Sequence, residues 1–389
     1  MAGENLMPKR IKLLQIQLRY NVAASDLAEQ ILLGLPASGF STTTAFLRGK
    51  PQADEPESAA ERSVYFDFSP GQLKGLRRWL ALWQLLKHCR QEQYDVIIAH
   101  RFKPMSMLMW LNRFMKVPVC IGIQHGIGDY DRFWRRLEAA ALVRPNWRTV
   151  GVSRAVEAYL VSKVGAFNAN NTHCINNAID IERAERIQID RETAREQLGL
   201  PADALIAGCI GRLVPVKGHN VLIKAFASIA ESYPQAQVAI IGGGRSHAEL
   251  SELASSLGVA EKVHFLGTRV DAMQYVKAFD LFVMPSYSEG LPLSLLEGLS
   301  GRLPAIGSDI DSLKPILEDS GSLQFRVGDH NELAARLEEI LNMSPEQRQS
   351  MGETGYGYLC RAHSIDDFRS NYRQLISDMA RSFAGASNE

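Results

Sequence analysis

Short apolar segments rich in β-branched residues alternate with longer amphipathic segments, and this alternation constrains the fold more than any other feature of the chain. Several of these segments are almost wholly apolar, which is typical of strands buried on both faces of a parallel sheet. Because strands separated by helical patterns predict βαβ units, and the pattern occurs twice, we expect an α/β protein with two doubly wound parallel-sheet domains facing across a cleft. The predicted strands are Ile11–Leu18, Ser63–Phe68, Asp95–Ala99, Val117–Gln124, Thr149–Val152, Thr172–Ile175, Leu205–Ile210, Gln237–Ile241, Val263–Leu266, Leu281–Met284 and Leu303–Ile306.

The domain limits follow from changes in composition along the chain. Residues 1–182 form the predicted first domain and residues 183–363 the second, which begins in the polar, charge-rich segment Ile181–Pro201. Residues 364–389 are predicted to form a helix that returns to the first domain. That helix has three apolar residues at helical spacing on one face: Phe368, Tyr372 and Ile376.

The charge of the chain is balanced in total but uneven along its length. Its 389 residues include 43 Lys and Arg against 43 Asp and Glu, and the net charge of +0 argues against a nucleic-acid partner bound through bulk electrostatics. Residues 1–182 nevertheless carry +7 and residues 183–389 carry −7. We interpret this asymmetry as a sign that the two domains face different partners, with compositional scatter as the alternative.

The cysteines and the apolar runs indicate the compartment. The five Cys residues lie far apart with no CxxC pair, so we expect neither a disulfide framework nor a zinc knuckle. The N-terminal residues lack an apolar signal segment, and no run approaches the ~18–20 apolar residues that span a bilayer. These features predict a cytoplasmic protein.

Two cations follow the predicted strand Leu205–Ile210 in the segment Gly211–Gly218. Arg212 and Lys217 stand at a strand–helix turn, where a helix N-terminus favours anions. Arg offers a planar fork for phosphate oxygens and Lys a mobile point charge, so the turn could neutralise a diphosphate leaving group without a metal. A solvated basic loop is the alternative for this turn taken by itself.

Two carboxylates separated by seven residues follow the strand Leu281–Met284. Glu289 lies in the predicted loop, and Glu297 lies about one turn into the next helix. A carboxylate accepts hydrogen bonds from paired hydroxyls, as in a ribose diol or a sugar ring, and the N–H groups of the Gly290–Leu293 turn could hold phosphate or hydroxyl oxygens. The alternative is that both residues are ordinary surface charges. Glu297, however, stands in an apolar helix, where burial of an acid is costly unless it has a binding partner.

Three glycines follow the strand Gln237–Ile241 and leave room for a flat or phosphorylated group near the backbone: Gly242, Gly243 and Gly244. A dinucleotide fingerprint requires a further Gly at position 247, where the chain has His247. The loop therefore argues against a nicotinamide-dependent oxidoreductase.

Together these segments resemble the retaining glycosyltransferases of family 4, which have the GT-B fold of two Rossmann-like domains. The resemblance is strongest over Leu205–Ile306, where five segments come in family order. They are the Gly-Arg…Lys-Gly turn, the Gly-rich turn, Phe265–Arg269, the strand Ala278–Ser286 and the Glu-x7-Glu block.

The resemblance implies roles for individual residues of the second domain. Arg212 and Lys217 would hold the donor diphosphate, and main-chain groups around Arg269 and Val270 would read the nucleobase. Glu297 would bind the ribose hydroxyls, and Glu289 would contact the donor sugar near the reacting carbon. The implied donor-binding set is Arg212, Lys217, Gly243, Arg269, Val270, Gly290, Leu291, Leu293 and Glu297.

The first domain matches the family at fewer positions. His125, at the end of the strand Val117–Gln124, resembles the family His that faces the donor sugar, although a lone satisfied His is the alternative. The implied catalytic set is Glu289, His125, Lys217 and Arg212. Family members commonly have a Gly-Gly turn after the first strand, but residues 17–25 contain no Gly, which leaves the placement of the acceptor open. The acceptor candidates at the ends of two strands are Arg19, Asn21, His100 and Arg101.

The implied reaction moves a hexose-type sugar from a nucleotide diphosphate sugar to a hydroxyl acceptor, with retention at the anomeric carbon. A UDP-sugar is expected before a GDP-sugar, and both bases stay open. We expect no metal and no cofactor, because Arg212, Lys217 and a helix N-terminus can stabilise the departing diphosphate, and no His/Asp/Cys cluster has metal-ligand spacing. The leaving phosphate itself is a candidate to accept the proton of the acceptor.

Basic and aromatic residues alternate in the segment Gly71–Gln91 and in the segments after residues 100 and 130. Such helices can lie on an anionic membrane surface, whereas core packing of any single stripe is the alternative. With the +7 charge, they favour an anionic or lipid-linked acceptor, such as a lipopolysaccharide or another surface-glycan intermediate, met at the inner face of the cytoplasmic membrane.

Two other functions are compatible with the same motifs. A nucleotide-sugar epimerase of this fold would act on the donor alone, and a non-catalytic subunit would bind a nucleotide sugar without turnover. The Glu-x7-Glu block favours transfer over epimerisation.

Overall fold

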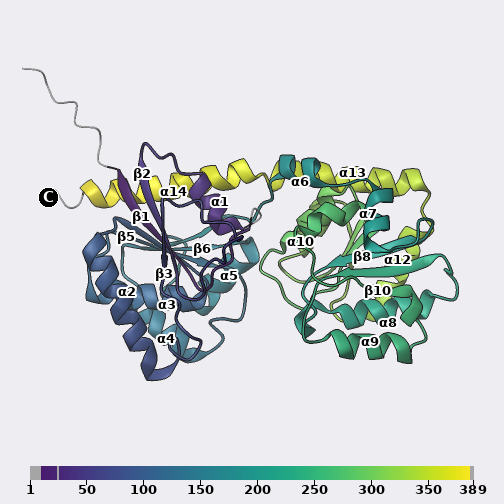
Figure 1. Ribbon diagram of the computed structural model, residues 1–389, viewed down its shortest axis with the longest axis horizontal. Coiled ribbons are helices and arrows are strands. Elements are labelled where there is room, and N and C mark those ends of the chain that lie inside the picture. The colour runs from purple at the N-terminus through teal and green to yellow at the C-terminus, as the bar shows by residue number, and fades with distance from the viewer. Residues whose placement is uncertain (1–9, 24–25, 386–389) are drawn as a thin grey trace, which may run out of the picture. The chain divides into compact units, whose positions relative to one another are not determined.

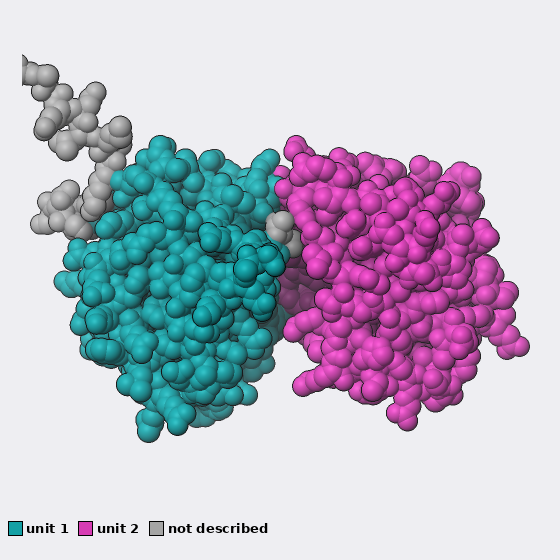
Figure 2. All heavy atoms as spheres, in the orientation of Figure 1, with its two compact units in different colours: residues 1–177, 365–389 teal, residues 178–364 magenta. Residues whose placement is uncertain are grey.

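The computed structural model of the chain describes residues 10–23 and 26–385 (Figure 1). It divides into two compact units, and Figure 2 shows each in its own colour. Unit 1 comprises residues 1–177 and 365–389, and unit 2 comprises residues 178–364. The first change of unit falls at residue 177 rather than at the expected 182, because the Ile179 N–H donates to the His363 carbonyl at 3.2 Å and ties this segment to unit 2. Likewise, the second change follows Ser364 rather than residue 363.

Unit 1 is built on a seven-stranded parallel sheet in the order β3-β2-β1-β4-β5-β6-β7. The central strands β1, β4 and β5 are buried almost throughout, as their apolar sequences predict. The strands are β1 Ile11–Gln17, β2 Phe40–Phe46, β3 Arg62–Tyr65, β4 Val96–His100, β5 Val119–Gln124, β6 Trp147–Gly151 and β7 Thr172–Cys174.

Six α-helices belong to the described part of unit 1. They are α1 Leu27–Leu33, α2 Arg78–Glu92, α3 Phe102–Phe114, α4 Phe133–Leu142, α5 Arg154–Lys163 and α14 Ile365–Gly385. The last of these packs beside α1, although more than 300 residues separate them (Figure 1). Arg369 Nε donates to Gln30 Oε1 at 3.0 Å, and the apolar face of α14 is buried through Phe368, Tyr372 and Ile376.

Unit 2 is built on a six-stranded parallel sheet in the order β10-β9-β8-β11-β12-β13. Its strands are β8 Leu205–Ile210, β9 Ala236–Ile241, β10 Val263–Phe265, β11 Leu281–Met284, β12 Ala305–Ser308 and β13 Leu323–Phe325. Its helices are α6 Ile181–Ile187, α7 Arg191–Leu198, α8 His219–Ile229, α9 His247–Ser256, α10 Leu293–Ser300, α11 Lys314–Asp319, α12 His330–Leu341 and α13 Pro345–Ala362. The apolar faces of α8 and α12 close one face of this sheet. The prediction of two parallel-sheet domains is confirmed.

The three basic, aromatic segments of unit 1 differ in burial. Helix α3 is mainly a core helix, because Met105, Met107, Leu108, Met109 and Leu111 are all buried. The other two segments leave large apolar side chains exposed: Leu76 in the 3-10 turn Gly75–Arg77, Trp79, Leu80 and Trp83 in the first half of α2, and Phe133, Trp134 and Leu137 in α4. Core packing therefore explains the α3 stripe but not these seven side chains.

The two units carry opposite net charges. Unit 1 holds 26 Lys and Arg against 18 Asp and Glu, and unit 2 holds 17 against 25. The resulting +8 and −8 exceed the ±7 of the sequence halves, since the segment 178–182 is acidic and belongs to unit 2. In the described part of the chain, no helix combines the length and apolar character needed to cross a bilayer.

Candidate functional site

The Gly-rich elements of unit 2 form one compact group at the carboxyl ends of its central strands. The loop after β8 bonds to the loop after β9, with the Gly211 N–H donating to Ile241 O at 2.9 Å and the Leu213 N–H to Gly243 O at 3.0 Å. Gly218 has a φ of +66°, and a Cβ there would overlap the carbonyl of Pro285. A Cβ on Gly242 would likewise overlap the carbonyl of Gly211, so the approach of the loop after β8 to the loops after β9 and β11 depends on glycine.

Lys217 and Glu289 form an ion pair between two of these loops. Lys217 Nζ lies 2.7 Å from Glu289 Oε1, and the two side chains are only 17% and 12% exposed. Lys217 ends a 3-10 turn over Pro215–Lys217, and helix α8 begins two residues later, at His219, so Lys217 stands at the predicted strand–helix turn. The structure thus brings together two residues that stand 72 positions apart and were both predicted to be catalytic.

Glu297 lies on α10, and its electrostatic environment differs from that of Glu289, the other acid of the Glu-x7-Glu block. Burial raises the pKa of its carboxyl to about 7, repulsion from Asp271 adds to the shift, and Lys217 and Arg183 oppose it. Asp271 is itself paired with Arg183 at 2.7 Å. In the described part of the chain, no ion pair forms on Glu297. An acid with a pKa near neutrality that faces a cation is a functional-site candidate.

The remaining predicted donor-site residues of unit 2 differ in burial. Gly290 and Leu291 are buried, Leu293 is half-buried, and Arg212, Arg269 and Val270 are exposed. Arg212 borders an open hollow of about 670 Å³ whose other lining residues are Val214, Pro215, Val216, Gly243, Gly244 and Arg245. Arg245 was not predicted from the sequence, although a cation directly after a Gly-rich turn is the signal that could have identified it.

His125 belongs to a buried hydrogen-bonded chain at the carboxyl edge of the unit 1 sheet. His125 Nε2 lies 3.2 Å from His100 Nδ1, and His100 Nε2 lies 3.1 Å from Gln15 Oε1. Burial lowers the pKa of His125 to about 3 and that of His100 well below its usual value, so both rings are neutral at pH 7. If the His100 Nε2–H donates to Gln15 Oε1, His100 Nδ1 carries no proton and accepts a hydrogen bond from the His125 Nε2–H. His125 is then held as the Nε2-protonated tautomer.

The acceptor candidates of unit 1 lie at this same edge. Arg19 and Asn21 follow β1, and Arg101 follows β4 with its N–H donating to the Ile123 carbonyl of β5 at 2.9 Å. Arg101 has a φ of +68°, a strained backbone conformation for a residue with a side chain. The side chains of all three are exposed, whereas His100 is buried. Gln15, the buried polar partner of His100, was missed because it lies within a strand, whereas the acceptor candidates were predicted at the ends of strands.

The described residues do not gather three or more His, Cys, Asp or Glu side chains in a group that could hold a metal ion. The expectation of metal-independent chemistry stays a prediction.

Two protein-family models match the chain, one in each unit. The model described as "Glycosyltransferase Family 4" matches residues 27–183, and the model described as "Glycosyl transferases group 1" matches residues 190–358. Together they span most of both parallel-sheet units.

Two named relatives match about half of the chain. One is a D-inositol 3-phosphate glycosyltransferase of Stackebrandtia nassauensis, with 29% identity over 206 residues, 49% of this chain and 46% of that protein. The other is the lipopolysaccharide core biosynthesis glycosyltransferase LpsE of Rhizobium meliloti, with 29% identity over 184 residues, 47% of this chain and 53% of that protein. The chain thus spans about half the length of these relatives.

Solved structures match nearly the whole chain and share its fold. A sucrose-phosphate synthase from Thermosynechococcus elongatus matches with a TM-score of 0.80 and 19% identity over 96% of this chain and all of that one. The Anabaena protein HepE, solved in complex with UDP, matches with a TM-score of 0.79 and 18% identity over 95% of this chain and all of that one.

Proposed function

The chain belongs to the family 4 glycosyltransferases with the GT-B fold, and we propose that it transfers a hexose-type sugar from a nucleotide diphosphate sugar to a hydroxyl of a bacterial glycan or glycolipid. The observation that carries this proposal is the Lys217–Glu289 pair, since it places a cation suited to a diphosphate beside a carboxylate suited to a sugar hydroxyl. We favour UDP as the nucleotide, because the structurally similar Anabaena HepE was solved with UDP.

The proposed reaction proceeds with retention and without a metal. The bond between the anomeric carbon and the diphosphate oxygen breaks, the acceptor oxygen bonds to that carbon, and the leaving phosphate takes the acceptor proton. Arg212 and Lys217 would stabilise the negative charge that builds on the diphosphate, because preorganised donors act most strongly where charge develops. Main-chain groups near Arg269 and Val270 would hold the nucleobase, and Glu297 would hold the ribose diol.

We propose lipopolysaccharide or another surface polysaccharide as the product. The similarity to the R. meliloti lipopolysaccharide core glycosyltransferase supports this choice. The positive charge of unit 1 and its exposed Trp79, Trp83, Phe133 and Trp134 support an anionic, amphiphilic acceptor at the membrane surface.

A panel of nucleotide sugars tests the donor half of the proposal. A ligand that binds only the folded state raises the melting temperature, and we expect the largest rise with UDP-hexoses. Incubation with the preferred donor and a truncated lipopolysaccharide should release UDP and lengthen the glycan. Conversion of the donor to an epimer in the absence of any acceptor would contradict transfer, and so would a lack of stabilisation by every nucleotide sugar.

A further inference from the structure

Cations follow five neighbouring strands of the unit 1 sheet. In the spatial order β3-β2-β1-β4-β5, each strand is followed in sequence by at least one Lys or Arg. Because the carboxyl ends of parallel strands meet at one edge, these side chains gather there. We call this group the cationic edge, and its members are Lys74, Arg48, Arg19, Lys103 and Arg135.

The charges of the cationic edge act on one another. The pKa of Lys103 is lowered by partial burial and then by repulsion from Lys74, Arg48, Arg19 and Arg135. No acid contributes an opposing effect among these causes. The cations of this edge therefore repel one another, and a bound anion would relieve that repulsion.

Two acids near the cationic edge, Glu138 and Asp129, are already paired. Glu138 accepts hydrogen bonds from Ser106 at 2.6 Å and Trp110 at 2.8 Å, and it pairs with Arg78 at 3.2 Å. Asp129 pairs with Arg135 at 2.9 Å. Among the described residues, no ion pair forms on four members of the cationic edge: Arg19, Arg48, Lys74 and Lys103. The Nε of Arg48 is moreover buried without a hydrogen-bond partner, which is costly unless a ligand supplies one.

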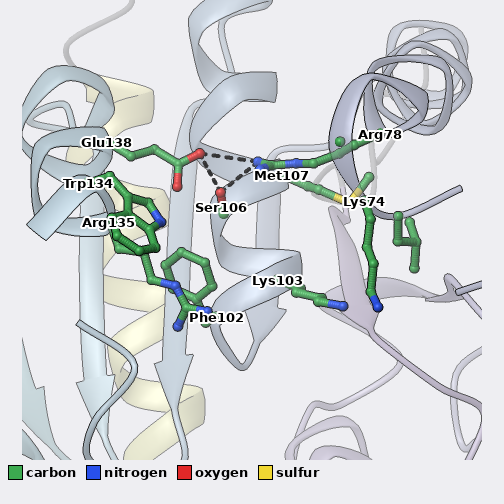
Figure 3. A pocket seen from close by; sticks show the side chains of 11 residues that line it. Lys74, Arg78, Phe102, Lys103, Ser106, Met107, Trp134, Arg135 and Glu138 are labelled. Atoms are coloured by element: carbon green, nitrogen blue, oxygen red, sulfur yellow. Dashed lines mark hydrogen bonds and ion pairs between the residues drawn. The ribbon is translucent and has the colours of Figure 1, made fainter. Parts of the chain in front are cut away.

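A cavity opens beside these cations between the start of α2, α3 and α4 (Figure 3). Its volume is about 250 Å³, below the ~300–1,000 Å³ typical of drug-sized ligands, so it would hold one sugar-sized group. Figure 3 shows the Lys74 and Lys103 side chains on one side of the cavity and Trp134 and Arg135 on the other. Phe102 is covered by the Arg135 guanidinium at 3.9 Å from its ring centroid. Trp134 has the Arg132 guanidinium at 5.5 Å from its ring centroid and stays 53% exposed, so it is the more accessible aromatic ring of the cavity.

We propose that this cavity binds a phosphorylated sugar of the acceptor, with Lys74 and Lys103 on the phosphate and Trp134 against the sugar ring. The inference rests on the proposed function, in which unit 1 receives the acceptor. A phosphate monoester carries about −1.5 to −2 charges, so it matches several unpaired cations better than a single carboxylate does. Arg19 and Arg48, which do not line the cavity, add long-range attraction from the same edge.

Binding of glucose 6-phosphate, with glucose as the uncharged control, tests the site by calorimetry at constant ionic strength. We expect glucose 6-phosphate to bind the wild-type protein at least about tenfold more tightly than glucose, because charged hydrogen bonds to the phosphate are gained. The double variant K74Q/K103Q should lose this preference. The control K116Q/K163Q removes two exposed, unpaired lysines of unit 1 outside the cavity and should keep it. Equal affinity for the two sugars, or equal behaviour of the two variants, would overturn the proposal.

Two further measurements separate this site from its alternatives. Vesicles of phosphatidylcholine with and without phosphatidylglycerol test a lipid headgroup as the source of the phosphate. Vesicle binding that depends on Lys74 and Lys103, without any glucose 6-phosphate binding, would replace the acceptor sugar by a membrane lipid and overturn the proposal. UDP binding tests the proposed function independently, since it should be unchanged in K74Q/K103Q. A wild-type protein that binds UDP but not glucose 6-phosphate would refute the cavity alone, whereas a wild-type protein that binds glucose 6-phosphate but no nucleotide sugar would refute the proposed function alone.

Discussion

At the residue scale, the Lys217–Glu289 pair accounts for much of the proposed chemistry. Lys217 is held by a carboxylate at 2.7 Å, and the donor diphosphate would compete with that carboxylate for the same ammonium group. The pair therefore holds Lys217 in the site before the donor arrives, and donor binding would exchange its carboxylate partner for the diphosphate.

Lys217→Ala should lower kcat about 10²–10³-fold, because one preorganised charge on the leaving group is lost. Circular dichroism should show an unchanged fold. Lys224→Ala, an exposed cation on α8, is the matched control and should leave kcat unchanged. A Lys217→Ala enzyme with wild-type kcat would remove Lys217 from the site.

If Glu297 holds the ribose diol as proposed, donor binding should depend on pH. Its carboxyl has a pKa of about 7, raised from 4.5 mainly by burial, so it gains its charge between pH 6 and 8 and then accepts hydrogen bonds from a ribose diol more strongly. The dissociation constant of UDP should therefore fall as the pH rises through 7, and Glu297→Gln should flatten this dependence. Calorimetry from pH 6 to 8 measures both, and an equally steep pH dependence in Glu297→Gln would assign the titration to another group.

The same shift has the opposite effect on folding. A raised acid pKa means that the folded protein binds the proton more tightly than the unfolded chain. The contribution of Glu297 to the free energy of unfolding is therefore largest at low pH and declines as the pH rises from about 4.5 to 7. A charged Glu297 at neutral pH therefore lowers the free energy of unfolding, and in the proposed function that charged carboxylate binds the ribose diol.

At the element scale, glycine sets the entry into α8. Gly218 is the N-cap residue in a left-handed conformation, with no space for a Cβ beside Pro285. Gly218→Ala should destabilise unit 2 by more than about 1 kcal/mol and weaken UDP binding, since it separates the loop after β8 from the loop after β11. Gly258→Ala is the matched control, because Gly258 has a similar φ of +72° but open space around it. Equal losses of stability in the two variants would show that backbone strain alone is responsible.

Strand β2 shows where sequence patterns were insufficient. The other strands of unit 1 were predicted from their apolar runs, but Phe40–Phe46 contains Thr42, Thr43 and Thr44, all of them buried. Their hydroxyls have partners far along the chain, such as Ser58 Oγ at 3.1 Å from Thr44 Oγ1 and the Glu61 N–H at 3.1 Å from Thr42 Oγ1. A buried strand made of polar residues depends on such distant partners, which a local pattern cannot reveal.

The candidate site was predictable to the extent that its residues follow apolar strands. Arg212, Glu289 and His125 could be located because each comes directly after or shortly after such a run. The cavity beside Lys74 and Lys103 could not, because it requires three helices whose packing is set by tertiary contacts. The sequence marked those helices as basic and aromatic, but only the structure separates the buried α3 from the exposed faces of α2 and α4.

At the scale of the whole molecule, the chain crosses between its units twice, so sequence order and structural membership differ. Helix α14 follows unit 2 in sequence but packs on α1 of unit 1. The two units have separate cores, so their unfolding need not be a single transition. The units also differ in net charge, which is +8 for unit 1 and −8 for unit 2.

Tyr372→Ala, a change near the C-terminus, should therefore destabilise unit 1 and not unit 2. Tyr372 is 1% exposed in the core of unit 1, and truncation of a buried aromatic side chain costs about 3–5 kcal/mol. Hydrogen exchange should accelerate in β1, β4 and β5 but not in β8 or β9, while UDP should protect only amides of unit 2 from exchange. Arg373→Ala, an exposed neighbour on α14, should change neither set of amides. Faster exchange in β8 or β9 of Tyr372→Ala would instead mean that the two units unfold as one cooperative structure, in which a ligand bound to one unit stabilises both.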